Sequence, residues 1–503
     1  MQGFLIGAGL VLAASAPVAA MAAEVDGVAS VDEVIVTGTR VSGLRAVDSP
    51  APIQVVDETA LKRSGATDLI GALALTVPSF QAQAVGGDMA NETLAARLRG
   101  LSPNHTLVLI NGKRRHGTSN LAILSSAFQG GAAADLSLIP LAAVARIEVL
   151  QDGAAAQYGS DAIAGVVNII LKADASGGEA SATGGGFYRG DGLTGDLSLN
   201  IGMKPGQNAF LNLTAETRYH DYANRGGPDQ RVEAAIASGA HPEWADLPGY
   251  PHLNRIFGDA RYQLNLASFN AGYDPDEATS FYAFGTVGTK YGVGWANFRL
   301  PTKLPALYPQ GFSPLDILNE TDFALTGGVR GQRLGWDIDL SSTYGEDDGR
   351  VRVKRSANVD LYNDTGATPT EFHAGEFIST QWTSTLDLKR EIAAGMAEPV
   401  TLAWGVEYRR ETYELGAGDA ASRYKAGSQS YPGFALTDAG AYARHNEAVY
   451  ADVAVRPVQP LSLDLAGRYE NFSDFGGTAV GKLTARYDLT PAFADGNADG
   501  VIG

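Results

Sequence analysis

The chain has 503 residues with 61 glycines, 20 tyrosines and 18 phenylalanines, and only 19% of its residues are charged. Its net charge of -18 argues against a nucleic-acid partner, because neutralising phosphates requires basic patches. The chain contains no cysteine, which excludes disulfides, thiolate nucleophiles and cysteine-based metal sites. At this length more than one structural unit is expected, and the composition favours many strands joined by turns.

The N-terminal residues 1–23 form an apolar run that ends in Ala20-Met21-Ala22. An apolar core followed by a small-x-small end is typical of a secretory signal peptide. A transmembrane helix is the alternative, but Gly7, Gly9 and Pro17 disfavour it. The first residues carry no Lys or Arg, so the position of the true start stays open.

A short β-prone segment, DEVIVTGTR at residues 32–40, follows within a linker that spans residues 24–47. Such a segment is either an ordinary edge strand or a strand kept free for addition to the sheet of a partner.

Residues 48–174 read as one α+β unit. Helices are expected at 58–64 and 67–75, and strands at 97–101 and 106–111. The dipeptide Asn111-Gly112 predicts a tight hairpin turn. A basic cluster follows this turn, composed of Lys113, Arg114, Arg115 and His116. A loop rich in small residues is expected from 117 to 137.

The unit ends in the stretch 139–172, around which the rest of the chain is organised. It contains a strand at 145–150, a turn at Asp152-Gly153 and a short segment of small residues at 154–160. A mostly apolar, β-branched run at 165–171 predicts a strand buried on both faces.

From residue 175 to residue 490 the pattern changes to period-two alternation over about ten residues with turns between, which is typical of a transmembrane β-barrel. Leu197, Leu199 and Ile201, for example, alternate with polar neighbours. Short turns alternate with long polar loops, expected at 221–267, 292–319, 346–379 and 415–443. A soluble β-sandwich also alternates, but it does not require this asymmetry of loops.

These motifs resemble those of TonB-dependent outer-membrane receptors. RIEVLQDGAAAQYGSDAIAGVVNIILK resembles the end of the family's plug domain, RLRGLSPNHTLVLINGKRR an earlier part of it, and DEVIVTGTR its TonB box. The resemblance implies a mostly β fold, in which an N-terminal α+β plug domain sits inside a transmembrane antiparallel β-barrel. It assigns the TonB box to Val34, Ile35, Val36 and Thr37.

About a dozen strands are expected in residues 175–490, whereas plugged transporters of this type use 22. The chain is therefore expected to be a C-terminally truncated fragment that does not insert as a closed transporter. The remaining residues, 491–503, form a tail rich in Asp and Gly. Its stretch from Asp495 to Gly503 matches the first nine positions of an EF-hand loop without the closing Glu, which leaves calcium binding open.

No catalytic residue, metal site or cofactor is predicted. Residues 153–160 lack the Lys of a phosphate-binding loop, and neither G-x-S-x-G nor H-E-x-x-H occurs. The seven histidines are scattered. Asp337 and Asp339 point the same way from one expected strand, where a solvated face in the lumen is the expected role.

The resemblance implies active transport across the outer membrane, driven through TonB, of a scarce solute such as a ferric siderophore, cobalamin or an oligosaccharide. TonB, outer-membrane lipid and the solute would be the partners. A passive ligand-binding or adhesive barrel, or a non-functional gene remnant, is the alternative. The basic cluster 113–116 is a candidate ligand contact, with a solvated basic turn or contacts to the barrel wall as the competing interpretation. The resemblance also predicts that the plug residues Arg99 and Arg146 pair with the inward barrel residues Glu407 and Glu470.

Overall fold

The computed structural model of the chain describes residues 46, 49–82, 89–122, 128–254, 256 and 259–489. The predicted signal peptide, the predicted TonB box and the tail 491–503 lie outside these residues. No helix among the described residues is long and apolar enough to cross a membrane. We call residues 49–172 the plug and the twelve strands that follow them the wall.

The plug is an α+β unit around a five-stranded mixed sheet with the order β1-β6-β7-β4-β5. These strands are β1 (Ile53–Asp57), β4 (Thr106–Ile110), β5 (Lys113–Arg114), β6 (Val144–Leu150) and β7 (Gly165–Leu171). A separate pair is formed by β2 (Phe80–Ala82) and β3 (Ala96–Leu98). The helices are α1 (Glu58–Arg63), α2 (Leu69–Thr76) and α3 (Ala155–Tyr158), with 3-10 turns η2 (Met89–Glu92), η3 (Pro103–His105), η4 (Leu136–Leu138) and η5 (Leu141–Ala143).

Local sequence signals account for most of these boundaries. Asp57 caps α1 by accepting from the amide of Ala60 at 2.6 Å. Asp68 caps α2 by accepting from the amide of Gly71 at 2.7 Å. The turn between β4 and β5 has positive φ at Asn111 and Gly112, 48° and 79°, as a type I′ turn requires. Strand β7 is central in the sheet and almost entirely buried, as its continuous apolar run predicts.

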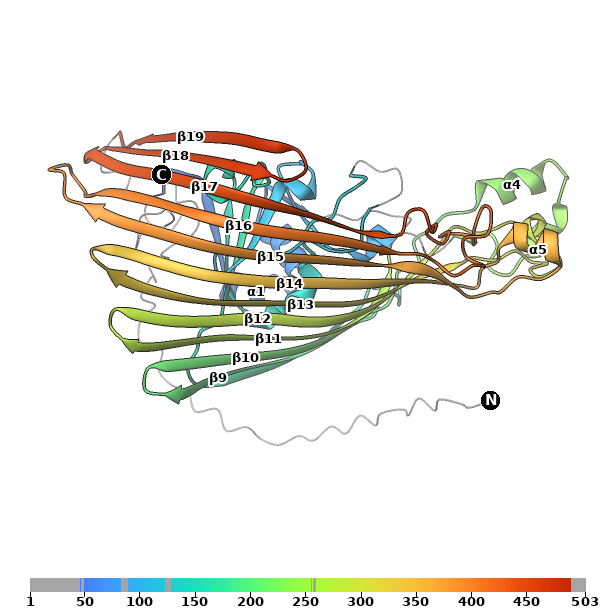
Figure 1. Cartoon of the computed structure of the whole chain (residues 1–503). Coiled ribbons are helices and arrows are strands. Elements are labelled where there is room, and N and C mark those ends of the chain that lie inside the picture. The colour runs from blue at the N-terminus through green and yellow to red at the C-terminus, as the bar shows by residue number, and fades with distance from the viewer. Residues whose placement is uncertain are drawn as a thin grey trace, which may run out of the picture. The chain divides into compact units, whose positions relative to one another are not determined.

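The wall is one antiparallel sheet in which each strand pairs with its neighbours in sequence, from β8 to β19 (Figure 1). Its strands are β8 (Gly178–Gly185), β9 (Thr194–Gly206), β10 (Ala209–His220), β11 (Arg261–Asp276), β12 (Thr279–Trp295), β13 (Leu315–Arg333), β14 (Trp336–Lys354), β15 (Phe372–Ile392), β16 (Val400–Gly416), β17 (Gly440–Val458), β18 (Leu461–Phe472) and β19 (Gly476–Tyr487). The expected dozen strands are confirmed.

The connections at one end of the wall are short, and most at the other end are long. The long loops carry α4 (Gln230–Ala237), α5 (Val359–Thr365), η6 (Pro242–Asp246) and η7 (Pro301–Lys303), and Figure 1 shows α4 and α5 beyond the same ends of the strands. The predicted loops were too long, because β13, β14 and β15 run further than the apolar alternation does. Their extensions keep ladder pairing, with one register shift between Val351 and Arg352, and include polar side chains such as Asp348 and Arg350 on β14.

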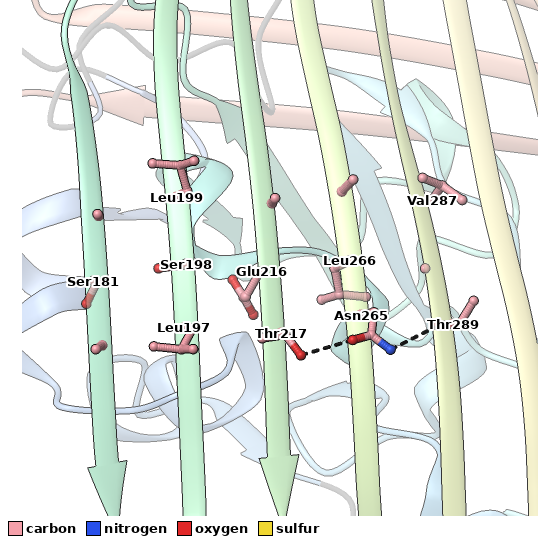
Figure 2. Close-up of a pocket in the computed structure, with 15 residues that line it drawn as sticks. Ser181, Leu197, Ser198, Leu199, Glu216, Thr217, Asn265, Leu266, Val287 and Thr289 are labelled. Atoms are coloured by element: carbon pink, nitrogen blue, oxygen red, sulfur yellow. Dashed lines mark hydrogen bonds between the residues drawn. The ribbon is translucent and has the colours of Figure 1, made fainter. Parts of the chain in front are cut away.

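The two faces of the wall differ in what they contact. One face packs on the plug: Leu264 and Leu266 of β11 form a buried cluster with Leu138, and Phe284 of β12 joins the core of the plug. The opposite face exposes apolar side chains such as Leu197, with 59% of its surface accessible. A concavity of about 740 Å³ lies on strands β8 to β12 and is shown in Figure 2. Leu197, Leu199 and Val287 are among the apolar side chains that line it. Thr217, Asn265 and Thr289 form a hydrogen-bonded row across it. This exposed apolar face is what a lipid-facing wall requires.

Candidate functional site: the ionic interface between plug and wall

The basic cluster 113–116 lies at the plug–wall interface and is buried there. The cluster begins directly after the tight turn at Asn111-Gly112. Its first two residues form β5, which is an edge strand of the plug sheet. All four side chains are less than one tenth exposed. A buried cation requires a compensating charge, and the wall supplies most of these.

Carboxylates on neighbouring strands of the wall pair with the cations of the cluster. Lys113 Nζ lies 3.2 Å from Asp339 on β14 and 3.4 Å from Asp387 on β15. The Arg115 guanidinium pairs with Asp322 on β13 and donates to Thr286 Oγ1 on β12 at 3.1 Å. His116 Nε2 also contacts Asp322, at 2.7 Å. Strands β12 to β15 are therefore all joined to one short segment of the plug.

The protonation states of the cluster follow from these contacts. Burial lowers the pKa of Lys113, but Asp387 and Asp339 outweigh it, so the pKa lies above its usual value and the ammonium stays charged. Burial lowers the pKa of His116, and the neighbouring Arg115 adds to the effect despite the contact with Asp322. His116 is therefore neutral at pH 7, and the buried charge is carried by Lys113 and its two arginine neighbours.

The wall also contributes cations in the opposite direction, and the most buried of those that pair with a plug carboxylate is Lys290 of β12. Its side chain is 2% exposed and pairs with Asp135 of the plug and, at 2.8 Å, with Glu320 of β13. Its ammonium also donates to the carbonyl oxygen of Glu92 at 2.9 Å. Asp135 in turn accepts from the amides of Leu94 and Ser137, at 3.2 and 2.8 Å. Lys290 thus joins the wall to the segment of the plug that contains η2.

A second contact region involves α3 and the residues that follow it. Ser160 donates its amide to Glu470 of β18 at 2.8 Å, and Gln157 donates to Asp452 of β17 at 3.1 Å. Asp161 pairs with Arg114 of the plug and lies 3.7 Å from Arg409 of β16. Burial raises the pKa of Asp161, but these two guanidinium groups outweigh it and bring the pKa to about 2.

Gly159 makes the close approach of this segment possible. Its φ is +124°, a conformation that side-chain-bearing residues rarely adopt. A Cβ at this position would lie 2.8 Å from Arg114 Nη2 and 3.5 Å from Glu470 Oε1. The glycine therefore lets the backbone lie against both the plug arginine and the wall glutamate.

The predicted pairs of plug arginines with Glu407 and Glu470 are wrong for the described residues. Both glutamates face inward, as the alternation predicts, but Arg468 of β18 satisfies them within the wall, at 3.2 and 3.1 Å. Arg146 pairs with Glu148 on its own strand at 2.8 Å. Arg99, at φ +54°, donates to the carbonyls of Ile163 and Ala164. The two glutamates therefore pair within the wall, and the two arginines bond within the plug.

The cluster 113–116 is also a candidate ligand contact, but the contacts that the structure shows for it are with the wall and within the plug. Its side chains are buried against the wall or the plug itself, so they are not presented to a solute in this conformation. Asp339 is not on a freely solvated face either, since it contacts Lys113 and accepts from Tyr282 at 2.6 Å. Alternation identified the inward carboxylates but did not single out Asp322, Asp387 or Lys290. Within the described ranges, no group of three or more His, Asp or Glu side chains is arranged to hold a metal ion.

Comparison with known proteins agrees with this architecture. Residues 45–166 match the family model of the TonB-dependent receptor plug domain, and residues 254–494 match the TonB-dependent receptor-like β-barrel. The vitamin B12 transporter BtuB of Photobacterium profundum is 32% identical over 250 residues, which are 46% of this chain and 38% of that protein. The chain therefore matches well under half the length of this relative.

Solved structures share the fold at low sequence identity. A variant of the ferric enterobactin receptor PfeA from Pseudomonas aeruginosa, in complex with enterobactin, has a TM-score of 0.63 at 14% identity. That match covers 88% of this chain and 61% of the receptor. The siderophore receptor PirA from Acinetobacter baumannii gives 0.60 at 15% identity, over 87% of this chain and 59% of the receptor. With both domain models matched in order along one chain, this protein belongs to the TonB-dependent receptor family.

Proposed function

We propose that the chain acts in TonB-dependent active transport of a scarce solute across the outer membrane. The family comprises receptors and transporters that reside in the outer membrane, and we propose that location for this chain as well. The buried ionic interface between plug and wall carries the proposal. A solute can pass only after the plug moves, and moving it separates Arg115 from Asp322 and Lys290 from Asp135.

The energetics of this interface favour an energised process. Separating one buried pair without replacing it costs about 3–5 kcal/mol, and several such pairs would break together. Thermal motion at RT of about 0.6 kcal/mol would rarely supply this. A pull on the plug from a partner would supply it, and strand addition at Val34–Thr37 is the proposed attachment. These residues lie outside the described part, so the TonB box remains a prediction from the sequence.

The solute class is proposed from the relatives. One relative is named for vitamin B12 and another for ferric enterobactin. Both of these solutes are scarce molecules too large for a porin. Cobalamin and ferric siderophores are therefore the first solutes to test, with an oligosaccharide next.

The test measures uptake and binding separately in cells that express a completed chain, because the 503 residues alone are not expected to insert as a closed transporter. Radiolabelled cyanocobalamin and ferric enterobactin serve as probes, each with and without a protonophore and in a strain without TonB. Accumulation that requires both the proton gradient and TonB would support the proposal. Surface binding without accumulation would overturn it in favour of the passive binding barrel.

A further inference from the structure

The carboxyl group of Glu92 stands out among the charged groups of the interface. Glu92 ends η2, in the segment 89–95 that we call the tip of the plug, and is 4% exposed. Neither of its carboxylate oxygens has a hydrogen-bond partner among the described residues. Every other acid described above at the interface contacts a cation or a donor. An orphaned carboxylate at this depth is rare, because burying an unpaired charge is costly.

The described strands of the wall leave room for this carboxyl group but offer it no hydrogen-bond partner. Gly292 of β12 faces it, and a Cβ on that glycine would lie 2.0 Å from Glu92 Oε2. The groups that face it are mostly acids: Glu320 and Asp316 from β13 and Asp135 from the plug. Lys290 of β12 is the cation that faces it, and its ammonium is already engaged by Asp135, Glu320 and the Glu92 carbonyl.

A proton resolves this electrostatic problem at the lowest cost. The neutral acid avoids both the desolvation penalty and the repulsion from the surrounding carboxylates. In agreement, burial raises the pKa of Glu92 to about 8; this effect is larger than the opposing attraction of Lys290, and the three acids raise the pKa further. No arrangement of acids in the described part is suited to a metal ion that could replace the proton.

The segment that carries Glu92 also holds the tip of the plug against the wall. Met89, at the other end of η2, is 1% exposed in an apolar cluster with Leu318 of β13 and Tyr431 of the loop before β17. Its carbonyl accepts from Asn120 Nδ2 at 2.7 Å. A charge that appeared on Glu92 would therefore act on a segment packed against both the wall and a long loop.

We propose that Glu92 holds a proton while η2 is seated against β12 and β13, and that release of this proton to water unseats the tip of the plug. The seated form binds the proton more tightly than the released form, in which the carboxyl group is hydrated. Seating is therefore strongest at low pH and weakens as the pH rises from about 4.5 to about 8. The inference rests on these contacts and not on the proposed transport, so the two can fail separately.

A cysteine at position 89 provides the readout, because the chain contains no other cysteine. The full chain in detergent micelles carries Met89→Cys, and its labelling rate with a maleimide is measured from about pH 5.5 to about pH 8. A second chain with Leu334→Cys, at a side chain 95% exposed, corrects for the reactivity of the thiol itself. The corrected rate for position 89 is expected to rise by about tenfold or more over this range.

The matched variants decide the cause. Glu92→Gln is neutral at every pH and should keep position 89 protected throughout, whereas Glu371→Gln removes an exposed carboxylate and should leave the rise unchanged. A rise that persists in Glu92→Gln, or a flat profile in the parent, would overturn the proposal.

An independent measurement covers the case in which Met89→Cys perturbs the fold. The infrared difference spectrum between the cysteine-free parent and Glu92→Gln, at about pH 6, should contain the C=O band of a protonated carboxyl group. The same difference taken with Glu371→Gln should lack it. Absence of the band in the first spectrum would also overturn the proposal.

Discussion

Arg115 of the plug and Asp322 of the wall form an ion pair in which the two side chains are only 1% and 2% exposed. Such a pair need not stabilise the protein more than an apolar contact would, because both charges lose their hydration. It does specify position. A shift of β13 by one residue would turn Asp322 toward the lipid-facing side and leave Arg115 buried without a carboxylate. We infer that the ionic interface fixes how the plug is seated.

Replacing Arg115 with methionine should therefore be strongly destabilising. The substitution keeps a long apolar side chain but leaves Asp322 buried with only His116 beside it, and that ring is neutral at pH 7. The free energy of unfolding in detergent micelles, measured by denaturant titration, is expected to fall by about 3–5 kcal/mol. Arg350→Met removes an exposed guanidinium paired with Asp348 and should change it by less than about 1 kcal/mol. Equal losses in the two variants would contradict the role given to the buried pair.

Lys290→Met should loosen the tip of the plug while the wall stays folded. The substitution leaves Asp135 and Glu320 without the cation they share. Hydrogen exchange of the amides of residues 92–95 is expected to become roughly 100-fold faster, which corresponds to about 3 kcal/mol. Lys303→Met, at an exposed cation on η7, is the control and should leave exchange unchanged. Uniformly faster exchange in the wall strands would instead indicate global destabilisation.

The parts of the fold that could be predicted are those that local sequence determines. The positive-φ turn at Asn111-Gly112 follows from residue types that tolerate that conformation. The inward direction of Glu407 and Glu470 follows from the two-residue period of a strand. The ends of β14 and β15 were missed, because ladder hydrogen bonds continue where the apolar pattern stops.

The partners across the interface could not be predicted in the same way. The two-residue period tells which face a side chain is on, but not how far along the wall it lies relative to the plug. Asp322, Asp339 and Asp387 meet the basic cluster because the stagger of three strands brings them to the level of β5. Arg468 lies two positions before Glu470 and on the same face of the wall. It pairs with both Glu407 and Glu470, so neither glutamate depends on an arginine of the plug.

Gly159→Ala should weaken the contact between the plug and β18. The new side chain would require a strained backbone at φ +124° and would displace Arg114, whose Nη2 lies 2.8 Å from the added Cβ. We expect a loss of about 1–3 kcal/mol in the free energy of unfolding, seen as a lower melting temperature. Gly184→Ala on β8 meets no atom within 4 Å and serves as the matched control. If both variants melt alike, the close approach at Gly159 is not needed for stability.

The last prediction concerns energy coupling at the predicted TonB box. If residues 34–37 join the sheet of a partner, main-chain donors and acceptors carry most of the affinity. In a completed chain, Ile35→Pro removes one donor and fixes φ, so it should abolish uptake of the transported probe while surface binding persists. Ile35→Val keeps the amide and the β propensity and should transport normally. Both variants are compared by energy-dependent accumulation and by binding to cells treated with a protonophore. Normal uptake by Ile35→Pro would exclude strand addition at this segment.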